Sequence, residues 1–240
     1  MIRPGGTYAL LLDFDGTLAE FRPMSEQAQC PAETRRLLAR LSRRPNVHVG
    51  VISGRRLGPL RQLVGVAGLA YAGVCGGETN GRLPAIRKET RDALERVRTA
   101  LEEDVRCVAG IQVEDKGVAF AVHFRGARAP AVRRAHAALR RALAGAGGKL
   151  RVLQGTHTWE VLPEEIKGKG EAVRAAMRRL PASAVGIYIG DDAADEPAFA
   201  ALPRGITVRV GRAGKTAARY WVRGPGEVFE LLTRIEEALQ

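Results

Sequence analysis

Short runs of apolar residues alternate with longer stretches of helical periodicity along most of the chain. The apolar runs at 8–12, 47–52, 185–189 and 206–210 have the length of buried strands, and the stretches between them repeat apolar residues every three or four positions. Strands that alternate with helices are typical of a parallel sheet covered on both faces. The pattern predicts a doubly wound, Rossmann-like α/β core.

The middle of the chain has a different pattern. Helical periodicity at 90–101 and at 131–143 is followed each time by two short strand-like runs. A helix followed by two strands, and then repeated, indicates an α+β unit with an antiparallel sheet. We therefore expect an inserted α+β cap domain at 84–162, between the two parts, 1–83 and 163–240, of one core domain.

The composition is that of a globular protein, since 45% of the 240 residues are hydrophobic and 27% are charged. No run of 18 apolar residues occurs, and the first apolar run ends at Asp13, so we expect neither a membrane-spanning helix nor a signal peptide. The three cysteines (Cys30, Cys75 and Cys107) do not have the spacing of a zinc site. Free thiols favour a cytoplasmic protein, and we expect a monomer.

The net charge of +12 could indicate a nucleic-acid or anionic membrane partner. Residues 84–165 carry 15 basic and 11 acidic side chains, and the rest of the chain carries 23 and 15, so no segment is a dedicated basic module. The helix expected at 131–143 has arginines opposite an apolar stripe, and either binds a polyanion or presents a solvated outer face. No aromatic residue interleaves these arginines, which favours the solvated face and no nucleic-acid or membrane partner.

Two acidic clusters directly follow buried strands. Asp13 and Asp15 follow the first strand, while Asp191 and Asp192 follow a later one, with Asp195 close behind. Ligand sites in open α/β sheets lie at the carboxyl ends of strands, and carboxylates this close repel one another unless a cation or a proton intervenes. Oxygen ligands suit Mg²⁺, so we predict a magnesium site. Acids at a helix N-terminus would explain the second cluster alone, not both.

A carboxylate beside a metal can attack a phosphoryl group, and a second acid can protonate the leaving oxygen and later activate water. The phosphate oxygens then need hydroxyl, amide and cationic partners. Ser53 and Gly54 follow the second strand and Lys169 begins a helix, so these residues can supply such partners.

The motifs resemble, in their order along the chain, those of the haloacid dehalogenase superfamily of phosphatases. They are Asp13-Phe14-Asp15-Gly16-Thr17, Ser53-Gly54-Arg55, Lys169-Gly170, and Gly190-Asp191-Asp192 with Asp195. The resemblance implies that Asp13 is the nucleophile and a Mg²⁺ ligand. It also implies that Asp15 is the general acid/base and binds Mg²⁺ through its carbonyl, that Ser53 and Lys169 hold phosphate, and that Asp191 binds Mg²⁺. Asp192 and Asp195 would support the site.

The pair Lys-Gly occurs twice, so Lys167 is an alternative to Lys169 as the phosphate-binding lysine. We prefer Lys169, because the residues after it run directly into a helical pattern.

Within that superfamily the chain resembles the trehalose-6-phosphate phosphatases over nearly its whole length. The segments that carry the resemblance are 110–125, 159–163, 190–199 and 223–228. That family's sugar-contacting positions correspond to Glu114, Lys116 and Glu160. The implied reaction is Mg²⁺-dependent hydrolysis of trehalose 6-phosphate to trehalose and phosphate through an aspartyl-phosphate.

The alternation of side chains at 118–125 is compatible with a sugar site. Ala119, Ala121, His123 and Arg125 share one face of the expected strand, opposite the large apolar residues. Two alanines beside His123 and Arg125 leave open polar room for a hydroxyl-rich ligand. An exposed sheet face with a half-buried His123 is the alternative.

One departure from the family pattern is Cys75, which stands where the family has the histidine of Asn-His-Gly-x-Glu. Because of this change, a phosphatase for another glycosyl phosphate remains an alternative. Examples of such substrates are sucrose 6-phosphate and mannosyl-3-phosphoglycerate. A basic nucleic-acid-binding protein is an alternative of a different class, and its test is salt-dependent binding to duplex DNA.

Overall fold

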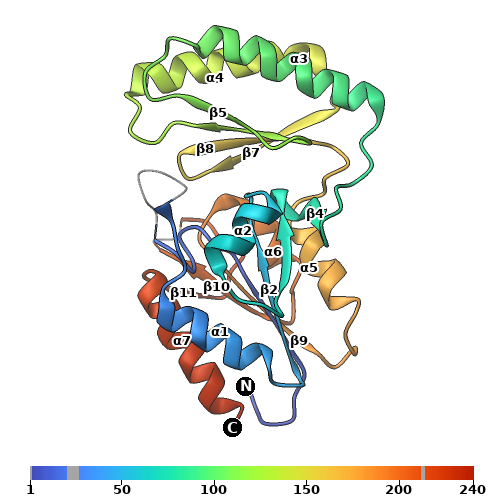
Figure 1. Ribbon diagram of the computed structural model, residues 1–240, viewed down its shortest axis with the longest axis vertical. Coiled ribbons are helices and arrows are strands. Elements are labelled where there is room, and N and C mark those ends of the chain that lie inside the picture. Colours follow the sequence, from blue (N-terminus) through green and yellow to red (C-terminus); the bar gives the residue numbers. More distant parts are fainter. Residues whose placement is uncertain (1, 21–26, 212–213) are drawn as a thin grey trace. The chain divides into compact units, whose positions relative to one another are not determined.

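The computed structural model describes residues 2–20, 27–211 and 214–240 (Figure 1). The chain divides into two compact units, which we call the large unit (Met1–Arg82 with Lys167–Gln240) and the small unit (Leu83–Ile166). The small unit is thus inserted between two segments of the large one, and each unit contains its own hydrophobic core.

The large unit contains a seven-stranded sheet in the order β11-β10-β9-β1-β2-β3-β4. Its strands are β1 (Tyr8–Leu12), β2 (Val47–Ile52), β3 (Ala70–Gly73), β4 (Glu78–Thr79), β9 (Val185–Gly190), β10 (Ile206–Val210) and β11 (Tyr220–Val222). All neighbouring strands are parallel except the pair β3 and β4. The central strand β1 is buried along its whole length, as expected for a strand covered on both faces.

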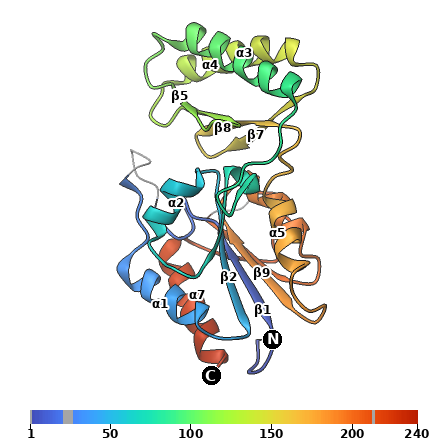
Figure 2. The same cartoon turned by 45° about the vertical axis from the view of Figure 1, so that its right-hand side comes forward.

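Helices cover both faces of this sheet (Figure 2). The helices α1 (Ala32–Ser42), α2 (Leu57–Val64) and α7 (Pro225–Ala238) pack on one face, and α5 (Lys169–Met177) and α6 (Glu196–Ala200) pack on the other. The alternation within β1 explains why two layers form, since Leu10 and Leu12 join the first core while Ala9 and Leu11 join the second. The predicted doubly wound α/β fold is confirmed.

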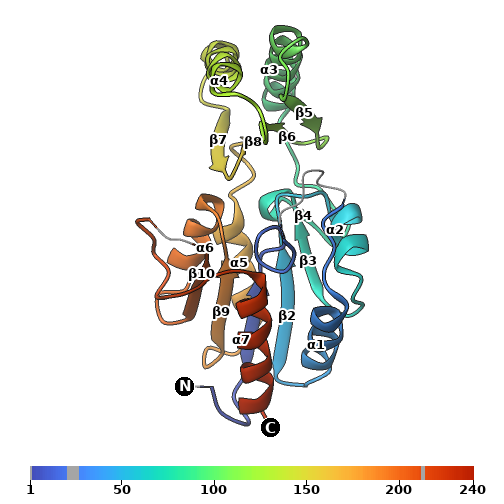
Figure 3. The ribbon, with the colours of Figure 1, turned by 90° about the vertical axis from the view of Figure 1, so that its left-hand side faces the viewer.

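The small unit contains a four-stranded antiparallel sheet in the order β5-β6-β8-β7. Its elements are α3 (Lys88–Val105), β5 (Gln112–Asp115), β6 (Phe120–His123), α4 (Ala129–Leu143), β7 (Leu150–Gly155) and β8 (Thr158–Pro163). The helices α3 and α4 lie side by side over one face of the sheet (Figure 3). Phe120, Val122 and Trp159 point into the core beneath them, so the opposite face carries the intervening residues.

The arginines of α4 lie on its outer face. Arg133, Arg134, Arg140 and Arg141 are all exposed, and Arg141 pairs with Asp104 of α3 at 3.0 Å. The buried residues of the helix face the sheet and α3. Along the described part of the chain, no helix combines the length and the apolar character needed to cross a membrane.

Candidate active site

The ends of β1 and β9 bring the two acidic clusters together. Leu12 pairs with Ile189 in the parallel register, and the Asp13 N–H continues the ladder by donating to the Ile189 carbonyl at 2.9 Å. The residues that follow the two strands therefore emerge side by side. Carboxylate oxygens of Asp13, Asp191 and Asp195 lie within 4.8 Å of one another.

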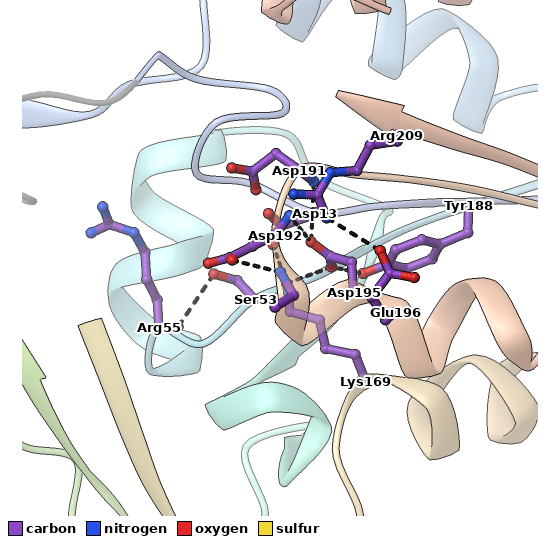
Figure 4. A network of polar contacts seen from close by, with 11 residues as sticks. Asp13, Ser53, Arg55, Lys169, Tyr188, Asp191, Asp192, Asp195, Glu196 and Arg209 are labelled. Atoms are coloured by element: carbon purple, nitrogen blue, oxygen red, sulfur yellow. Dashed lines mark hydrogen bonds and ion pairs between the residues drawn. The ribbon is translucent and has the colours of Figure 1, made fainter. Parts of the chain in front are cut away.

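Lys169 is the cation of this cluster (Figure 4). It is the first residue of α5 and is buried, and its Nζ donates to Asp13 Oδ1 and to Asp195 Oδ1, both at 2.7 Å. Lys167, two residues earlier, is exposed. Of the two lysines considered from the sequence, Lys169 is therefore the one that reaches the acidic cluster.

Asp195 uses both of its carboxylate oxygens within the protein. Its Oδ1 accepts from Lys169 and from the Tyr188 hydroxyl at 2.6 Å, and its Oδ2 accepts the N–H groups of Asp191 and Asp192 at 3.1 and 2.9 Å. Asp195 thereby fixes the loop after β9. Asp192 caps the short turn that follows, since its side chain accepts from the Ala193 N–H at 2.6 Å. The alternative interpretation of the second acidic cluster, in which acids stabilise the N-terminus of a helix, therefore applies to Asp192.

Asp15 is held apart from this cluster by an arginine. Its carboxylate accepts two hydrogen bonds from Arg55, from Nε at 2.7 Å and from Nη2 at 2.6 Å, in the fork geometry that favours a fixed orientation. The Arg55 guanidinium also lies 5.4 Å from the centroid of the Phe14 ring. Ser53 is buried beside it, with its Oγ accepting the Arg55 N–H at 3.2 Å, and Gly54 lies between them, partly buried.

The cluster contains more acid than base. Burial raises the pKa of Asp13 to about 7, with Asp195 and Asp15 adding to the shift and Lys169 opposing it. Burial and the charges of Asp13 and Asp195 also raise the pKa of Asp191 well above its usual value. Burial alone would lower the pKa of Lys169, but the carboxylates of Asp13 and Asp195 raise it well above the ordinary value. One ammonium among several carboxylates leaves a negative site suited to a divalent cation.

A second polar cluster lies on the helix-free face of the small unit's sheet. Glu114 and Glu160 flank Ala121 in the register of three neighbouring strands. The buried Lys116 donates to Glu160 Oε1 at 2.7 Å and lies 3.9 Å from Glu114 Oε2, while His123 Nε2 contacts Glu114 Oε2 at 2.8 Å.

The face expected to house a sugar carries Lys116 beside Ala121. Ala119 and Ala121 are buried, and the Lys116 ammonium reaches the two glutamates that flank Ala121. The strand alternation did not predict this side chain, and the polar room above the two alanines stays a prediction. Arg125 lies in the turn after β6 and is exposed.

Two residues of the large-unit site had no role in the sequence interpretation. Arg55 is part of the motif Ser53-Gly54-Arg55, but the sequence did not indicate that it pairs with Asp15. Tyr188 is the polar residue of an otherwise apolar strand, and its ring is fully buried against Phe199. A buried tyrosine hydroxyl needs a hydrogen-bond partner, so this position carried a signal for a nearby acceptor.

The fold is shared with a haloacid dehalogenase-like hydrolase from Bacteroides thetaiotaomicron, with a TM-score of 0.67 at 17% identity over 95% of this chain and 99% of that one. The family and the relatives that the chain matches place it among the phosphoric monoester hydrolases. The family model described as trehalose-phosphatase matches residues 11–216. The chain belongs to the trehalose-phosphatase family.

Individual relatives agree with this assignment. The trehalose-6-phosphate phosphatase of Escherichia coli (strain K12) is 32% identical over an alignment that covers 97% of this chain and 88% of that protein. The trehalose-phosphate phosphatase of Mycobacterium ulcerans (strain Agy99) is also 32% identical, but the chain covers only 62% of its length. The solved C-terminal domain of the Candida albicans trehalose-6-phosphate phosphatase has the same fold, with a TM-score of 0.82 at 22% identity over 96% of this chain and 92% of that one.

Proposed function

We propose that the protein is a Mg²⁺-dependent phosphatase that hydrolyses trehalose 6-phosphate to trehalose and phosphate through an aspartyl-phosphate on Asp13. The observation that carries the proposal is the buried Lys169 between Asp13 and Asp195, beside Asp191, at the carboxyl ends of two central strands. Membership of the trehalose-phosphatase family supports the choice of substrate.

The residues of the site fit a magnesium ion. We assign its ligands to the carboxylates of Asp13 and Asp191 and to the carbonyl oxygen of Asp15. Asp195 is the less suitable ligand, because its two oxygens already accept four hydrogen bonds. The raised pKa values of Asp13 and Asp191 reflect negative charge that a cation would offset. When bound, the ion supplies charge compensation and orientation for the phosphoryl group.

The chain's own residues account for the two half-reactions. A carboxylate oxygen of Asp13 attacks phosphorus, the phosphorus–oxygen bond to the sugar breaks, and the leaving oxygen takes a proton from Asp15. Water then attacks the aspartyl-phosphate while Asp15 removes its proton, which releases phosphate and restores Asp13. Ser53, Gly54 and Lys169 hold the phosphoryl oxygens throughout.

The contact between Arg55 and Asp15 orients the general acid/base. Both carboxylate oxygens of Asp15 accept from the Arg55 guanidinium, at 2.6 and 2.7 Å. We assign to Arg55 the role of holding Asp15 in one orientation through both half-reactions.

We assign recognition of the sugar to the polar face of the small unit, through Glu114, Lys116, His123, Arg125 and Glu160. Glu160 Oε2 is buried and has no hydrogen-bond partner among the described residues, so it is an acceptor that a sugar hydroxyl can satisfy. The ion pair with Lys116 fixes the direction in which this oxygen points.

A second candidate is a phosphatase for another glycosyl phosphate, and Cys75 is the observation that favours it. Its thiol is buried, and its N–H donates to the Ser53 carbonyl at 2.9 Å, so the residue that replaces the family's histidine lies next to the phosphate-binding loop. A thiol is smaller than an imidazole and is a weaker hydrogen-bond donor, so the substitution changes what the loop offers to a substrate.

Phosphate release with Mg²⁺ from a panel of sugar phosphates tests the proposal. The panel comprises trehalose 6-phosphate, sucrose 6-phosphate and mannosyl-3-phosphoglycerate, with Asp13→Asn as the inactive reference. Turnover of another ester without turnover of trehalose 6-phosphate would replace the substrate assignment by the second candidate. Turnover that persists in Asp13→Asn would refute the aspartyl-phosphate.

We further propose that the enzyme acts in the cytoplasm as a monomer. No disulfide bond joins Cys30, Cys75 or Cys107 in the described part of the chain, as is usual in a reducing compartment. Light scattering on a size-exclusion column tests the oligomeric state.

A further inference from the structure

Residues 74–78, which follow β3 and end with the first residue of β4, contact the loop that carries Ser53. We call them the brace segment. The Val74 N–H donates to the Arg55 carbonyl at 2.8 Å, and the Cys75 N–H donates to the Ser53 carbonyl at 2.9 Å. Two of the three carbonyl groups of the Ser53–Arg55 loop are therefore held by the backbone of the brace segment.

Glu78, at the end of the brace segment, adds a third attachment. Its side chain is buried, and its Oε2 accepts the N–H of Leu57, the first residue of α2, at 2.8 Å. The first N–H groups of a helix have no partner within the helix, and the residue before Leu57, Arg56, makes no capping hydrogen bond with its side chain. Glu78 thus caps α2 from a distant part of the chain.

The backbone of the brace segment is strained. Val74 and Cys75 have φ values of 49° and 54°, in the left-handed region that costs a non-glycine residue about 1–3 kcal/mol. Gly73 approaches the loop so closely that a Cβ would lie 2.6 Å from the Leu57 nitrogen and 2.7 Å from the Arg55 carbonyl oxygen. Such strain persists only where the surrounding contacts fix the conformation. The attachment to the Ser53 loop is therefore tight.

The same segment contacts the element that carries Lys169. A Cβ on Gly76, whose φ is 94°, would lie 2.7 Å from Ala172 Cβ and 3.3 Å from the Gly168 carbonyl oxygen. Lys169 begins α5 between these two contacts. The brace segment thus touches both elements to which we assign phosphate binding, and all of these contacts lie within the large unit.

We propose that Glu78 is a positioning residue for phosphoryl transfer. By holding the Leu57 N–H it fixes the Ser53–Arg55 loop, and with it the Ser53 hydroxyl and the Arg55 partner of Asp15, relative to Lys169. The inference rests on the proposed function, because these are the groups assigned there to the phosphate and the proton. Glu78 itself does not contact the reacting atoms.

A matched pair of variants separates the reach of this side chain from its charge. Glu78→Asp keeps the charge but is one methylene too short for the Leu57 N–H, whereas Glu78→Gln keeps an oxygen at the same reach and loses the charge. The control is Glu227→Asp, because Glu227 also accepts a backbone N–H beside a helix start, that of Arg223 at 2.8 Å, outside the site. The measurements are kcat, KM, Tm and the hydrogen-exchange rate of the Leu57 amide.

We expect Glu78→Asp to lower kcat about tenfold or more with KM changed less than about threefold, because displacement of catalytic groups by about 1 Å can cost up to about a hundredfold in rate. Glu78→Gln should stay within about threefold of wild type in kcat, and its Leu57 amide should exchange at least about tenfold more slowly than that of Glu78→Asp. Glu227→Asp should lower Tm slightly and leave kcat within about twofold.

Equal kcat in wild type and Glu78→Asp overturns the inference, and so does a Glu78→Gln variant as slow as Glu78→Asp. A purely structural glutamate would lower Tm and leave kcat unchanged, which also counts against positioning. If the wild type hydrolyses only another sugar phosphate of the panel, the same comparison is made with that ester. If the wild type hydrolyses no sugar phosphate of the panel, the proposed function is wrong. That result differs from the one that overturns the role of Glu78, in which wild type and Glu78→Asp are both active with equal kcat.

Discussion

Replacing Lys169 by methionine tests the electrostatics of the site most directly. Methionine is close to lysine in length and shape, so the change removes the ammonium while leaving the packing of α5 in place. Lys169 is buried and bridges Asp13 and Asp195 at 2.7 Å each. Without it, the carboxylates of Asp13, Asp191 and Asp195 remain within 4.8 Å of one another and lose the ammonium that bridges two of them.

The expected loss of stability follows from that geometry. Removing one partner of a buried ion pair costs about 3–5 kcal/mol, because the other partner stays buried without its counter-charge. For a chain of this size about 1 kcal/mol lowers Tm by roughly 2–4 °C, so Lys169→Met should lower Tm by roughly 10 °C at pH 8. Phosphate release should fall below detection, since the phosphoryl oxygens lose their cation.

The loss of stability in Lys169→Met should increase with pH. The pKa of Asp13 in the folded protein is raised to about 7, so between pH 4 and 7 the folded state retains a proton that the unfolded state has lost. Stability therefore falls as pH rises through that window. Lys169 opposes this shift, so its removal raises the pKa of Asp13 further and extends the loss to higher pH. The Tm difference from wild type should be larger at pH 8 than at pH 5.5.

Thermal melts without added metal at the two pH values measure this effect. Lys167→Met is the matched control, because Lys167 is only two residues away but is exposed, and it should shift Tm by less than about 2 °C. A Lys169→Met variant that melts within 2 °C of wild type at both pH values would falsify the assignment of Lys169 as the cation of the acidic cluster.

Three further outcomes are expected. Asp13→Asn should reduce phosphate release at least about a thousandfold while its Tm at pH 8 is no lower than that of wild type, since a buried carboxylate has been neutralised. Mg²⁺ should raise the wild-type Tm more at pH 8 than at pH 6, because Asp13 and Asp191 must lose protons to bind it. Asp191→Asn should abolish this rise in Tm. An equal rise at both pH values would contradict the link between Mg²⁺ binding and proton loss. Glu160→Gln should raise KM for trehalose 6-phosphate about tenfold and leave hydrolysis of p-nitrophenyl phosphate unchanged, whereas parallel losses on both esters would argue against sugar recognition.

The sequence allowed the fold class to be predicted because it depends on patterns that repeat locally. The alternation of strands and helices indicated a parallel sheet, and the ends of parallel strands share one edge, so Asp13, Asp15 and Asp191 could be expected as neighbours. The register of Leu12 with Ile189 brings Asp13 and Asp191 together, whereas the Asp15 carboxylate pairs with Arg55 and is not part of that cluster.

The remaining features of the site depend on where side chains from separate loops point. Arg55 lies in a loop after β2, yet its guanidinium reaches Asp15 in the loop after β1. The side chain of Glu78 in β4 accepts the N–H of Leu57, the first residue of α2. Neither spacing follows from periodicity, because each contact is set by loop conformation, including the left-handed residues of the brace segment. The position of Lys116 beside Ala121 is also set by a loop, since Lys116 lies in the turn between β5 and β6.

The position of β1 at the centre of the large sheet has a consequence for the biosynthesis of the protein. Its partner β2 follows within about 40 residues, but its other partner β9 pairs Val185 with Tyr8. At 5–20 residues per second the ribosome needs roughly 10–35 s to deliver β9, and during that time one hydrogen-bonding edge of an apolar strand has no partner. All residues of the small unit, Leu83–Ile166, are synthesised before β9. The nascent chain therefore carries the whole small unit while the sheet of the large unit still has an unpaired edge that can associate with other chains.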